Sequence, residues 1–166
     1  MIKNKRILIL GGAGFIGFYL AKRLLNNNKI TIVDNLSKIK RKDQQLKKLL
    51  KIKNIKFHQK DIRKINPNNF PRNFHYIFDC AAIVGVKKVI EKSYFSLEHN
   101  IKLTLNAIEI AKKQKKLKKI IFCSSSEVYD GGGKFYNTKY PVQERYPITM
   151  SDIYHKRTVY MSSKIL

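Results

Sequence analysis

Lys5–Leu10 (KRILIL) and Gly11–Gly17 (GGAGFIG) stand next to each other near the start of the chain, and together they decide its fold. The first piece is rich in Ile and Leu and stops at a glycine, which is typical of a strand buried on both faces. The second piece opens a segment, 14–25, whose apolar residues recur at helical spacing. Glycine at 11, 14 and 17 permits a tight turn, close approach of a phosphate and close packing of helix on strand. Because a helix amino terminus also favours negative charge, the sequence predicts a strand, a phosphate-binding turn and a helix in succession.

An acidic residue lies at a characteristic distance from this turn. Asp34 follows a second predicted strand, 30–33, and stands twenty positions after Gly14. A carboxylate there can bind the ribose hydroxyls of an adenine dinucleotide and would repel the extra phosphate of NADP, so the sequence predicts NAD. The competing interpretation, a glycine-rich turn with an incidental aspartate, ignores the strand and helix on either side. The cations nearby are interpreted as surface residues: Lys38, Lys40 and Arg41.

Strand-like and helix-like segments alternate along the rest of the chain. The further predicted strands are 55–58, 76–79 and 119–123, and the further helices are 44–50 and 95–113. The longer helix carries one apolar face, formed by Leu97, Ile101, Leu105, Ile108 and Ala111. Strands separated by helices imply parallel pairing with right-handed crossovers, so the predicted fold is α/β, a Rossmann doubly wound parallel sheet. Residues 126–152 show no regular pattern, which is typical of a functional loop, and 154–166 look helical.

The composition fits a globular protein with a large excess of positive charge. Of the 166 residues 43% are hydrophobic, and 35 basic and 11 acidic side chains give a net charge of +24. Such a charge points to nucleic acid or an anionic membrane as a partner. However, only 7 of the basic residues are arginine, the usual side chain for reading bases. Ile, Lys and Asn, all with A/T-rich codons, make up 63 residues, so a biased genome explains the lysines and we expect no specific nucleic-acid partner.

The sequence predicts neither a membrane segment nor a secreted or metal-binding protein. No apolar run reaches the ~18 residues of a spanning helix, and Ile7–Leu10 is too short for the core of a signal peptide, so we expect a soluble, cytoplasmic protein. Cys80 and Cys123 are too few for a disulfide framework. Each ends a predicted strand, and we interpret them as buried thiols rather than a redox pair. The histidines lack the spacing of metal ligands: His58, His75, His99 and His155.

Tyr160 and Lys164 stand four residues apart in the last predicted helix, which places them on one face. A cation beside a phenol favours the phenolate, so the pair can take a proton from a substrate hydroxyl. Ser124–Glu127 (SSSE) follows the strand at 119–123, at the sheet edge where ligands of such folds bind. A serine hydroxyl there can hydrogen-bond the reacting oxygen of a substrate, and ordinary turn or helix-cap chemistry is an equally open alternative.

Together these residues resemble the extended short-chain dehydrogenase/reductase family, specifically its NAD-dependent nucleotide-sugar epimerases and dehydratases. The pieces that match in order and spacing are the glycine motif 11–17, Asp34–Ser37, Asp61-Ile62, Ala81-Ala82, Asn100, Ser124–Tyr129 and the Tyr160/Lys164 pair. The resemblance implies an enzyme that passes a hydride from a sugar carbon, usually C4, to NAD and forms a transient 4-keto sugar.

The resemblance also implies a role for each matching residue. The residues expected around NAD are Gly11, Gly14, Phe15, Ile16 and Gly17 at the diphosphate, Asp34 and Asn35 at the adenosine ribose, Asp61 and Ile62 at adenine, Ala81, Ala82 and Ile83 along the cofactor's path, with Asn100, Ser124, Tyr160 and Lys164 completing the set. For catalysis, Ser125 would orient the sugar hydroxyl and Tyr160 would be the base. Lys164 would bind the nicotinamide ribose and tune Tyr160.

The two residues after the expected catalytic serine distinguish the subfamilies. The 4,6-dehydratases usually carry Asp-Glu there, whereas this chain has Ser126-Glu127, which disfavours dehydration. A Ser-Glu pair resembles sugar-nucleotide decarboxylases, such as those acting on UDP-glucuronate, and some epimerases. Glu127 is therefore either a second catalytic acid/base or a salt-bridged loop residue.

The family's chains continue well beyond the helix that carries Tyr160 and Lys164, whereas this sequence stops at Leu166. We therefore interpret 1–166 as an NAD-binding Rossmann domain that is truncated before the lobe for the nucleotide sugar, and expect it alone to turn over slowly or not at all. The full-length protein is expected to bind a nucleotide sugar and to form a homodimer. Two other classes stay open, a non-catalytic dinucleotide-binding module and a basic polyanion binder.

Overall fold

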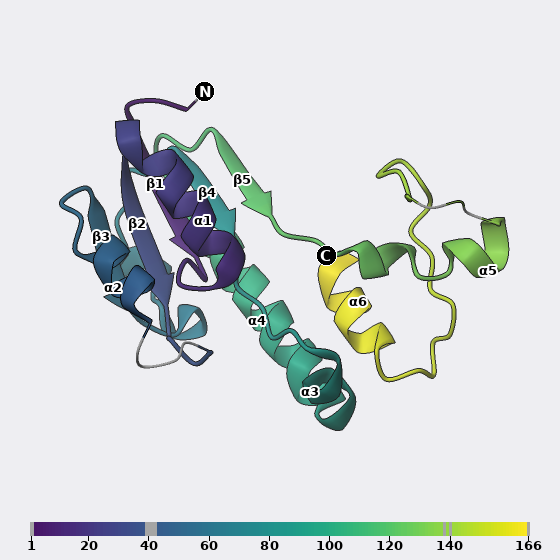
Figure 1. The fold of residues 1–166 in the computed structure, drawn as a ribbon. Coiled ribbons are helices and arrows are strands. Elements are labelled where there is room, and N and C mark those ends of the chain that lie inside the picture. Colours follow the sequence, from purple (N-terminus) through teal and green to yellow (C-terminus); the bar gives the residue numbers. More distant parts are fainter. Residues whose placement is uncertain (1, 39–42, 138, 140, 166) are drawn as a thin grey trace. The chain divides into compact units, whose positions relative to one another are not determined.

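Five parallel strands form one sheet in the computed structural model of the protein, which describes residues 2–38, 43–137, 139 and 141–165 (Figure 1). The strands are β1 (Lys5–Leu10), β2 (Asn28–Asp34), β3 (Ile55–Gln59), β4 (Tyr76–Asp79) and β5 (Lys119–Phe122). Their order is β3-β2-β1-β4-β5, so the direction of travel reverses between β1 and β4. In open α/β sheets this reversal marks the crevice where ligands bind. The prediction of an α/β Rossmann sheet is confirmed.

Both faces of β1 are buried because its side chains alternate between two cores. The α-helices are α1 (Phe15–Leu24), α2 (Gln44–Leu50), α3 (Val86–Glu91), α4 (Ser93–Lys112), α5 (Gly132–Tyr136) and α6 (Thr158–Ile165). Ile9 belongs to a cluster with Ala21 of α1 and Leu49 of α2, whereas Leu8 belongs to a cluster with Ile110 of α4. This alternation explains why the four residues Ile7–Leu10 form a continuous apolar run.

α4 packs only in part through the stripe that the sequence predicts. Leu105 and Ile108 of the predicted face are 56% and 40% exposed, whereas Ala111 of that face is buried together with Leu103, Ala107 and Ile110. Both sets recur every three or four residues, so helical periodicity alone does not distinguish them. The covered stripe belongs to one core cluster with Leu8 and Leu10 of β1 and Ile77 of β4.

The chain divides into two compact units, which we describe separately. The sheet unit consists of the residues up to Ala82 together with Lys102–Cys123, and the helical unit consists of Ile83–Ile101 together with the residues from Ser124 onward. The helical unit departs from the predicted pattern, because 126–152 contains regular structure. A short 3₁₀ helix, η4 (Ser126–Tyr129), begins where the Ser125 side chain accepts a hydrogen bond from the Glu127 N–H, and α5 follows it. The last helix, expected at 154–166, begins at Thr158.

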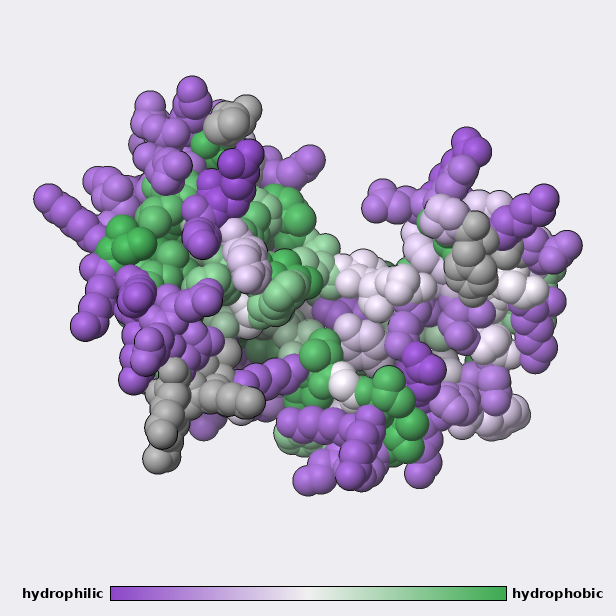
Figure 2. Space-filling view, in the orientation of Figure 1, coloured by the Kyte–Doolittle hydropathy of each residue, from purple (hydrophilic) through white to green (hydrophobic). Residues whose placement is uncertain are grey.

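The face of the molecule drawn in Figure 2 carries mostly polar side chains. Figure 2 shows hydrophilic residues spread over the visible face and interrupted by smaller hydrophobic areas. Among the residues that the structure describes, none of the helices has the length and apolar character needed to cross a bilayer.

Candidate active site

The glycine turn between β1 and α1 is built so tightly that a side chain at Gly11 or Gly17 would overlap backbone atoms. Gly11 has φ +71°, and a Cβ there would lie 2.7 Å from the backbone N and Cα of Ala81. A Cβ on Gly17 would lie 2.6 Å from the Gly11 carbonyl oxygen, so the helix could not approach the turn. At Gly14 a Cβ would meet only the Gly11 oxygen, at 3.3 Å. Gly14 thus leaves space beside the start of α1 that the protein itself does not fill.

The amino terminus of α1 supplies hydrogen-bond donors at this space. Gly14 is the N-cap, and the N–H groups of the first turn have no acceptor within the helix. The side chains of Phe15 and Ile16 are 81% and 58% exposed, so they do not cover the turn. These first-turn amides, together with the helix dipole, suit a diphosphate group.

Asp34 reaches the glycine turn from the end of β2. Its Oδ2 accepts a hydrogen bond from the Ala13 N–H at 3.1 Å, and its Oδ1 accepts one from the Leu36 N–H at 2.7 Å. A carboxylate can accept about four hydrogen bonds, so capacity remains for ribose hydroxyls. Asn35 is exposed, and its side chain accepts the Ser37 N–H at 3.0 Å. The structure therefore brings the predicted acid beside the predicted turn.

Lys38, which the sequence indicates only as a surface residue, joins two of the predicted cofactor segments. The Lys38 Nζ donates a hydrogen bond to the Ala82 carbonyl oxygen at 2.9 Å. It thereby connects the loop after β2 to the segment after β4, and interpreting it as a plain surface residue was incomplete. Spacing gave no signal for this contact, because 44 residues separate the partners. Lys40 and Arg41 lie outside the described residues.

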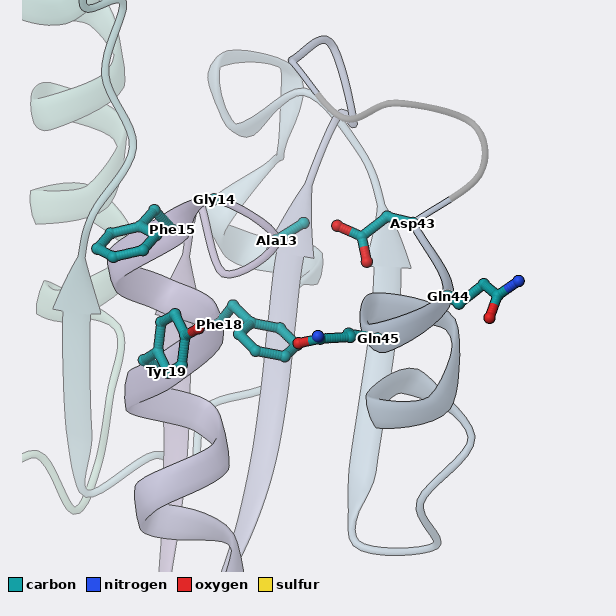
Figure 3. A pocket seen from close by; sticks show the side chains of 8 residues that line it. All are labelled: Ala13, Gly14, Phe15, Phe18, Tyr19, Asp43, Gln44 and Gln45. Atoms are coloured by element: carbon teal, nitrogen blue, oxygen red, sulfur yellow. The ribbon is translucent and has the colours of Figure 1, made fainter.

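A hollow of about 600 Å³ adjoins the glycine turn (Figure 3). It is lined by Ala13, Gly14, Phe15, Phe18, Tyr19, Asp43, Gln44 and Gln45. Figure 3 shows the aromatic side chains of α1 on one side and the first residues of α2 on the other. Neither Asp34 nor Asp61 lines it, so the hollow borders the predicted diphosphate site without containing the predicted adenosine contacts.

Asp61 and Ile62 differ in what they can offer a ligand. Asp61 accepts the Arg63 backbone N–H at 3.0 Å and also holds the Arg63 guanidinium, with Nε to Oδ1 at 3.0 Å. The Ile62 side chain is 5% exposed and lies in the core, and its carbonyl oxygen accepts a hydrogen bond from Asn106. A contact with adenine from this segment would therefore involve Asp61 rather than the Ile62 side chain.

The other predicted residues belong to the helical unit, where Asn100 is a central hydrogen-bonding group. Asn100 is 2% exposed; its Oδ1 accepts the Ile83 N–H at 2.7 Å and its Nδ2 donates to the Ile83 oxygen at 3.2 Å. The same Nδ2 donates to the Ser163 Oγ at 3.2 Å, and Ser163 in turn donates to the Tyr160 carbonyl oxygen at 2.7 Å. Asn100 thus fixes Ile83 and the helix of Tyr160 to α4.

Tyr160 and Lys164 face each other on α6 as predicted. The Lys164 Nζ lies 6.0 Å from the centre of the Tyr160 ring. Lys164 is only 5% exposed, and Tyr160 is half-buried. A poorly hydrated ammonium group interacts more strongly with a nearby phenol than a solvated one would.

The segment that carries Ser125 is bonded to both ends of α6. The Ser124 Oγ donates to the Lys164 carbonyl oxygen at 2.9 Å, in the last turn of the helix. At the other end, Glu127 Oε1 and Arg157 Nη2 are 2.6 Å apart, and Arg157 directly precedes α6. The hydrogen bond with Glu127 and its negative charge raise the pKa of Arg157 above its ordinary value. Glu127 therefore has the salt-bridged environment that was one of its two open interpretations.

The structure brings the predicted residues together in two sets. The sheet unit holds the glycine turn, Asp34, Asn35, Asp61, Ile62, Ala81 and Ala82, and the helical unit holds Ile83, Asn100, Ser124, Ser125, Glu127, Tyr160 and Lys164. Arg157 was not predicted from the sequence, although its position three residues before Tyr160 was a usable signal. Within the described residues, no three His, Cys, Asp or Glu side chains are arranged to hold a metal ion.

A family model for the NAD dependent epimerase/dehydratase family matches residues 7–166. The chain belongs to this family. NAD is the cofactor of the family, as the glycine turn and Asp34 predict. A curated family member, UDP-N-acetyl-alpha-D-glucosaminuronate decarboxylase of Bacillus cytotoxicus, is 41% identical over 131 residues, which are 78% of this chain and 39% of the relative.

Solved structures of family members are similar over nearly the whole chain. The UDP-N-acetylglucosamine 4-epimerase from Methanobrevibacter ruminantium M1, in complex with UDP-N-acetylmuramic acid, matches 99% of this chain and 48% of its own with a TM-score of 0.78 and 27% identity. The UDP-glucuronic acid 4-epimerase from Bacillus cereus, in complex with NAD, shares the fold with a TM-score of 0.74 at 24% identity, over 96% of this chain and 49% of its own. The chain thus spans less than half the length of these relatives.

Proposed function

We propose that this chain is the NAD-binding part of a nucleotide-sugar enzyme that works by transient hydride transfer. The proposal rests on one observation in the helical unit. Buried Lys164 faces Tyr160, and both ends of α6 are bonded to the turn that carries Ser125. Family membership supports the class of substrate, because relatives of this chain are named for UDP-sugars. When bound, NAD supplies a hydride acceptor and donor.

The sheet unit supplies the groups for holding the cofactor. We assign the first-turn amides of α1, including those of Phe15 and Ile16, to the diphosphate. Asp34 accepts hydrogen bonds from the ribose hydroxyls with the capacity left by Ala13 and Leu36, and its charge rejects a 2′-phosphate. Lys38 keeps the segment after β4 in place through Ala82.

The helical unit supplies the groups for moving a proton. Tyr160, as phenolate, accepts the proton of the sugar hydroxyl whose carbon loses hydride. Lys164 favours that phenolate because its ammonium group is adjacent and poorly solvated. Ser125 hydrogen-bonds the same sugar oxygen, and the reverse proton transfer from Tyr160 accompanies return of the hydride.

Replacing Tyr160 with Phe in the full-length protein tests this assignment. We expect kcat for interconversion of UDP-sugar epimers to fall by about 10²- to 10⁴-fold, because the base is lost, while NAD affinity changes little. Tyr154→Phe is the matched control, since Tyr154 is 89% exposed and has no assigned role. Chromatographic separation of the product sugars measures turnover. Full turnover by the Tyr160→Phe protein would show that Tyr160 is not the base.

A further inference from the structure

Cys80 and Cys123 lie side by side where two neighbouring strands end. In the parallel pairing of β4 with β5, Asp79 stands opposite Phe122, and Cys80 and Cys123 are the next residues of the two strands. The Cys123 N–H donates to the Asp79 carbonyl oxygen at 3.0 Å, which continues this pairing. The two Sγ atoms are 3.7 Å apart, and both residues are half-buried thiols.

We propose that Cys80 and Cys123 are an oxidation site that closes reversibly into an intramolecular disulfide. The bond requires a sulfur–sulfur distance of about 2.05 Å and Cα atoms about 4.4–6.8 Å apart. Neighbouring strands lie about 4.7–4.9 Å apart, so the backbone spacing is already suitable. Closing the remaining gap requires side-chain rotation and a small local shift. The earlier interpretation as buried thiols followed from position in the chain, which does not show that the two strands are neighbours.

The reaction needs an oxidant, for which a small-molecule disulfide such as glutathione disulfide is suitable. One cysteine thiolate attacks a sulfur of that disulfide, which forms a mixed disulfide and releases one glutathione. The second cysteine thiolate then attacks the protein sulfur of the mixed disulfide and releases a second glutathione. The two protein thiols lose two protons and two electrons in total, and one glutathione disulfide becomes two glutathiones.

The cysteine pair lies next to the glycine turn, so formation of the disulfide would alter that turn. A Cβ on Gly11 would lie 2.7 Å from Ala81 and 2.9 Å from the carbonyl carbon of Cys80, so the turn rests directly on the backbone of Cys80 and Ala81. A turn without spare room transmits a shift of that backbone. The reduced form is the one in which Asp34 and the turn amides have the geometry described above. We therefore expect the disulfide form to bind NAD more weakly.

The bond itself is tested by peptide mapping after oxidation. The protein is treated with glutathione disulfide and digested with trypsin without reduction. Cleavage at lysine and arginine places Cys80 in peptide 73–87 and Cys123 in peptide 120–134. We expect these two peptides joined to each other within one protein molecule, and separated again by a reductant.

Cys80→Ser and Cys123→Ser are the matched controls. Each variant keeps one thiol, so we expect it to accumulate a glutathione adduct that the native pair resolves. Stable glutathione adducts on the native protein, or linkage of 73–87 to 120–134 only between two protein molecules, would overturn the proposal.

The effect on the turn is measured by NAD titration of the reduced and the oxidised protein. This part rests on the proposed placement of NAD at the glycine turn, whereas the peptide map does not. We expect about fivefold or greater loss of NAD affinity on oxidation, and by linkage saturating NAD should lower the equilibrium constant for disulfide formation by the same factor. Equal affinity of both forms would refute the coupling, and NAD binding by neither form would instead refute the proposed cofactor site. For this titration the oxidised protein is prepared with diamide, which adds no glutathione, and Cys80→Ser, which cannot form the intramolecular bond, should bind NAD equally before and after the same treatment.

Discussion

At the scale of single residues, Glu127 and Arg157 connect two segments that carry proposed catalytic groups. Glu127 is two residues after Ser125, and its N–H donates to the Ser125 Oγ at 3.2 Å. Arg157 is three residues before Tyr160, and its carbonyl oxygen accepts the Tyr160 N–H at 3.0 Å. The side chains of the pair are 28% and 44% exposed, so their ion pair contributes little to stability. The role of the ion pair is to position the start of α6 relative to the turn that carries Ser125.

We expect Arg157→Met in the full-length protein to lower kcat by roughly 10- to 100-fold with a small change in KM, because misplaced catalytic groups react slowly. Arg157→Lys, which keeps the charge but not the guanidinium group, should recover part of the loss. Steady-state kinetics and thermal unfolding measure the two effects. Should Glu127→Gln abolish turnover and remove a limb of the pH profile while Arg157→Met has no effect, Glu127 is an acid/base rather than a positioning residue.

Gly11 is a residue whose replacement can be predicted from its backbone. We expect Gly11→Ala to destabilise the protein by about 1–3 kcal/mol, because a side chain at φ +71° is strained and its Cβ would overlap Ala81. NAD affinity should fall as well. Gly133→Ala is the matched control, since a Cβ there meets nothing within 4 Å. Urea unfolding and NAD titration measure both effects, and equal behaviour of the two variants would contradict the proposed packing of the turn.

At the scale of elements, α4 shows how one helix with two apolar stripes is oriented by the sheet. Ile110 is fully buried in the core beneath β1, and Ile108, two residues earlier, is 40% exposed. We expect Ile110→Ala to destabilise the protein by about 2–5 kcal/mol, because it opens a cavity in a packed core. Ile108→Ala removes the same atoms and should cost about 0.5 kcal/mol or less. Denaturant unfolding of the two variants measures the difference, and a reversed order would mean that the helix packs by the predicted stripe after all.

At the scale of the whole molecule, the net charge of +24 raises the question of a polyanion partner. Binding by charge alone weakens steeply with salt, by about 10³- to 10⁵-fold between about 50 and 200 mM for a protein with several phosphate contacts. NAD held by the turn amides and Asp34 is a small ligand, so we expect its affinity to change only a few-fold over that range. Calorimetric titration at both salt concentrations measures this. Loss of saturable NAD binding at the higher salt would favour the basic polyanion binder.

The sequence by itself determined the features that depend on local spacing. The run at 5–10, the glycines at 11, 14 and 17, and the interval between Tyr160 and Lys164 each have a physical meaning within one or two elements, and each is found as predicted. The alternation of strands and helices likewise determined a parallel sheet, because parallel strands need crossovers. Asp34 lies beside the glycine turn, as its distance from Gly14 in the sequence predicts.

Only the tertiary structure decided the features that depend on pairing between distant segments. The choice of stripe on α4, the contact of Lys38 with Ala82, the ion pair of Glu127 with Arg157 and the closeness of Cys80 to Cys123 join residues far apart in the chain. Periodicity repeats every few residues and carries no information about which strand lies beside which. Strand order and register supply that information, because they are set by the burial of all strands together.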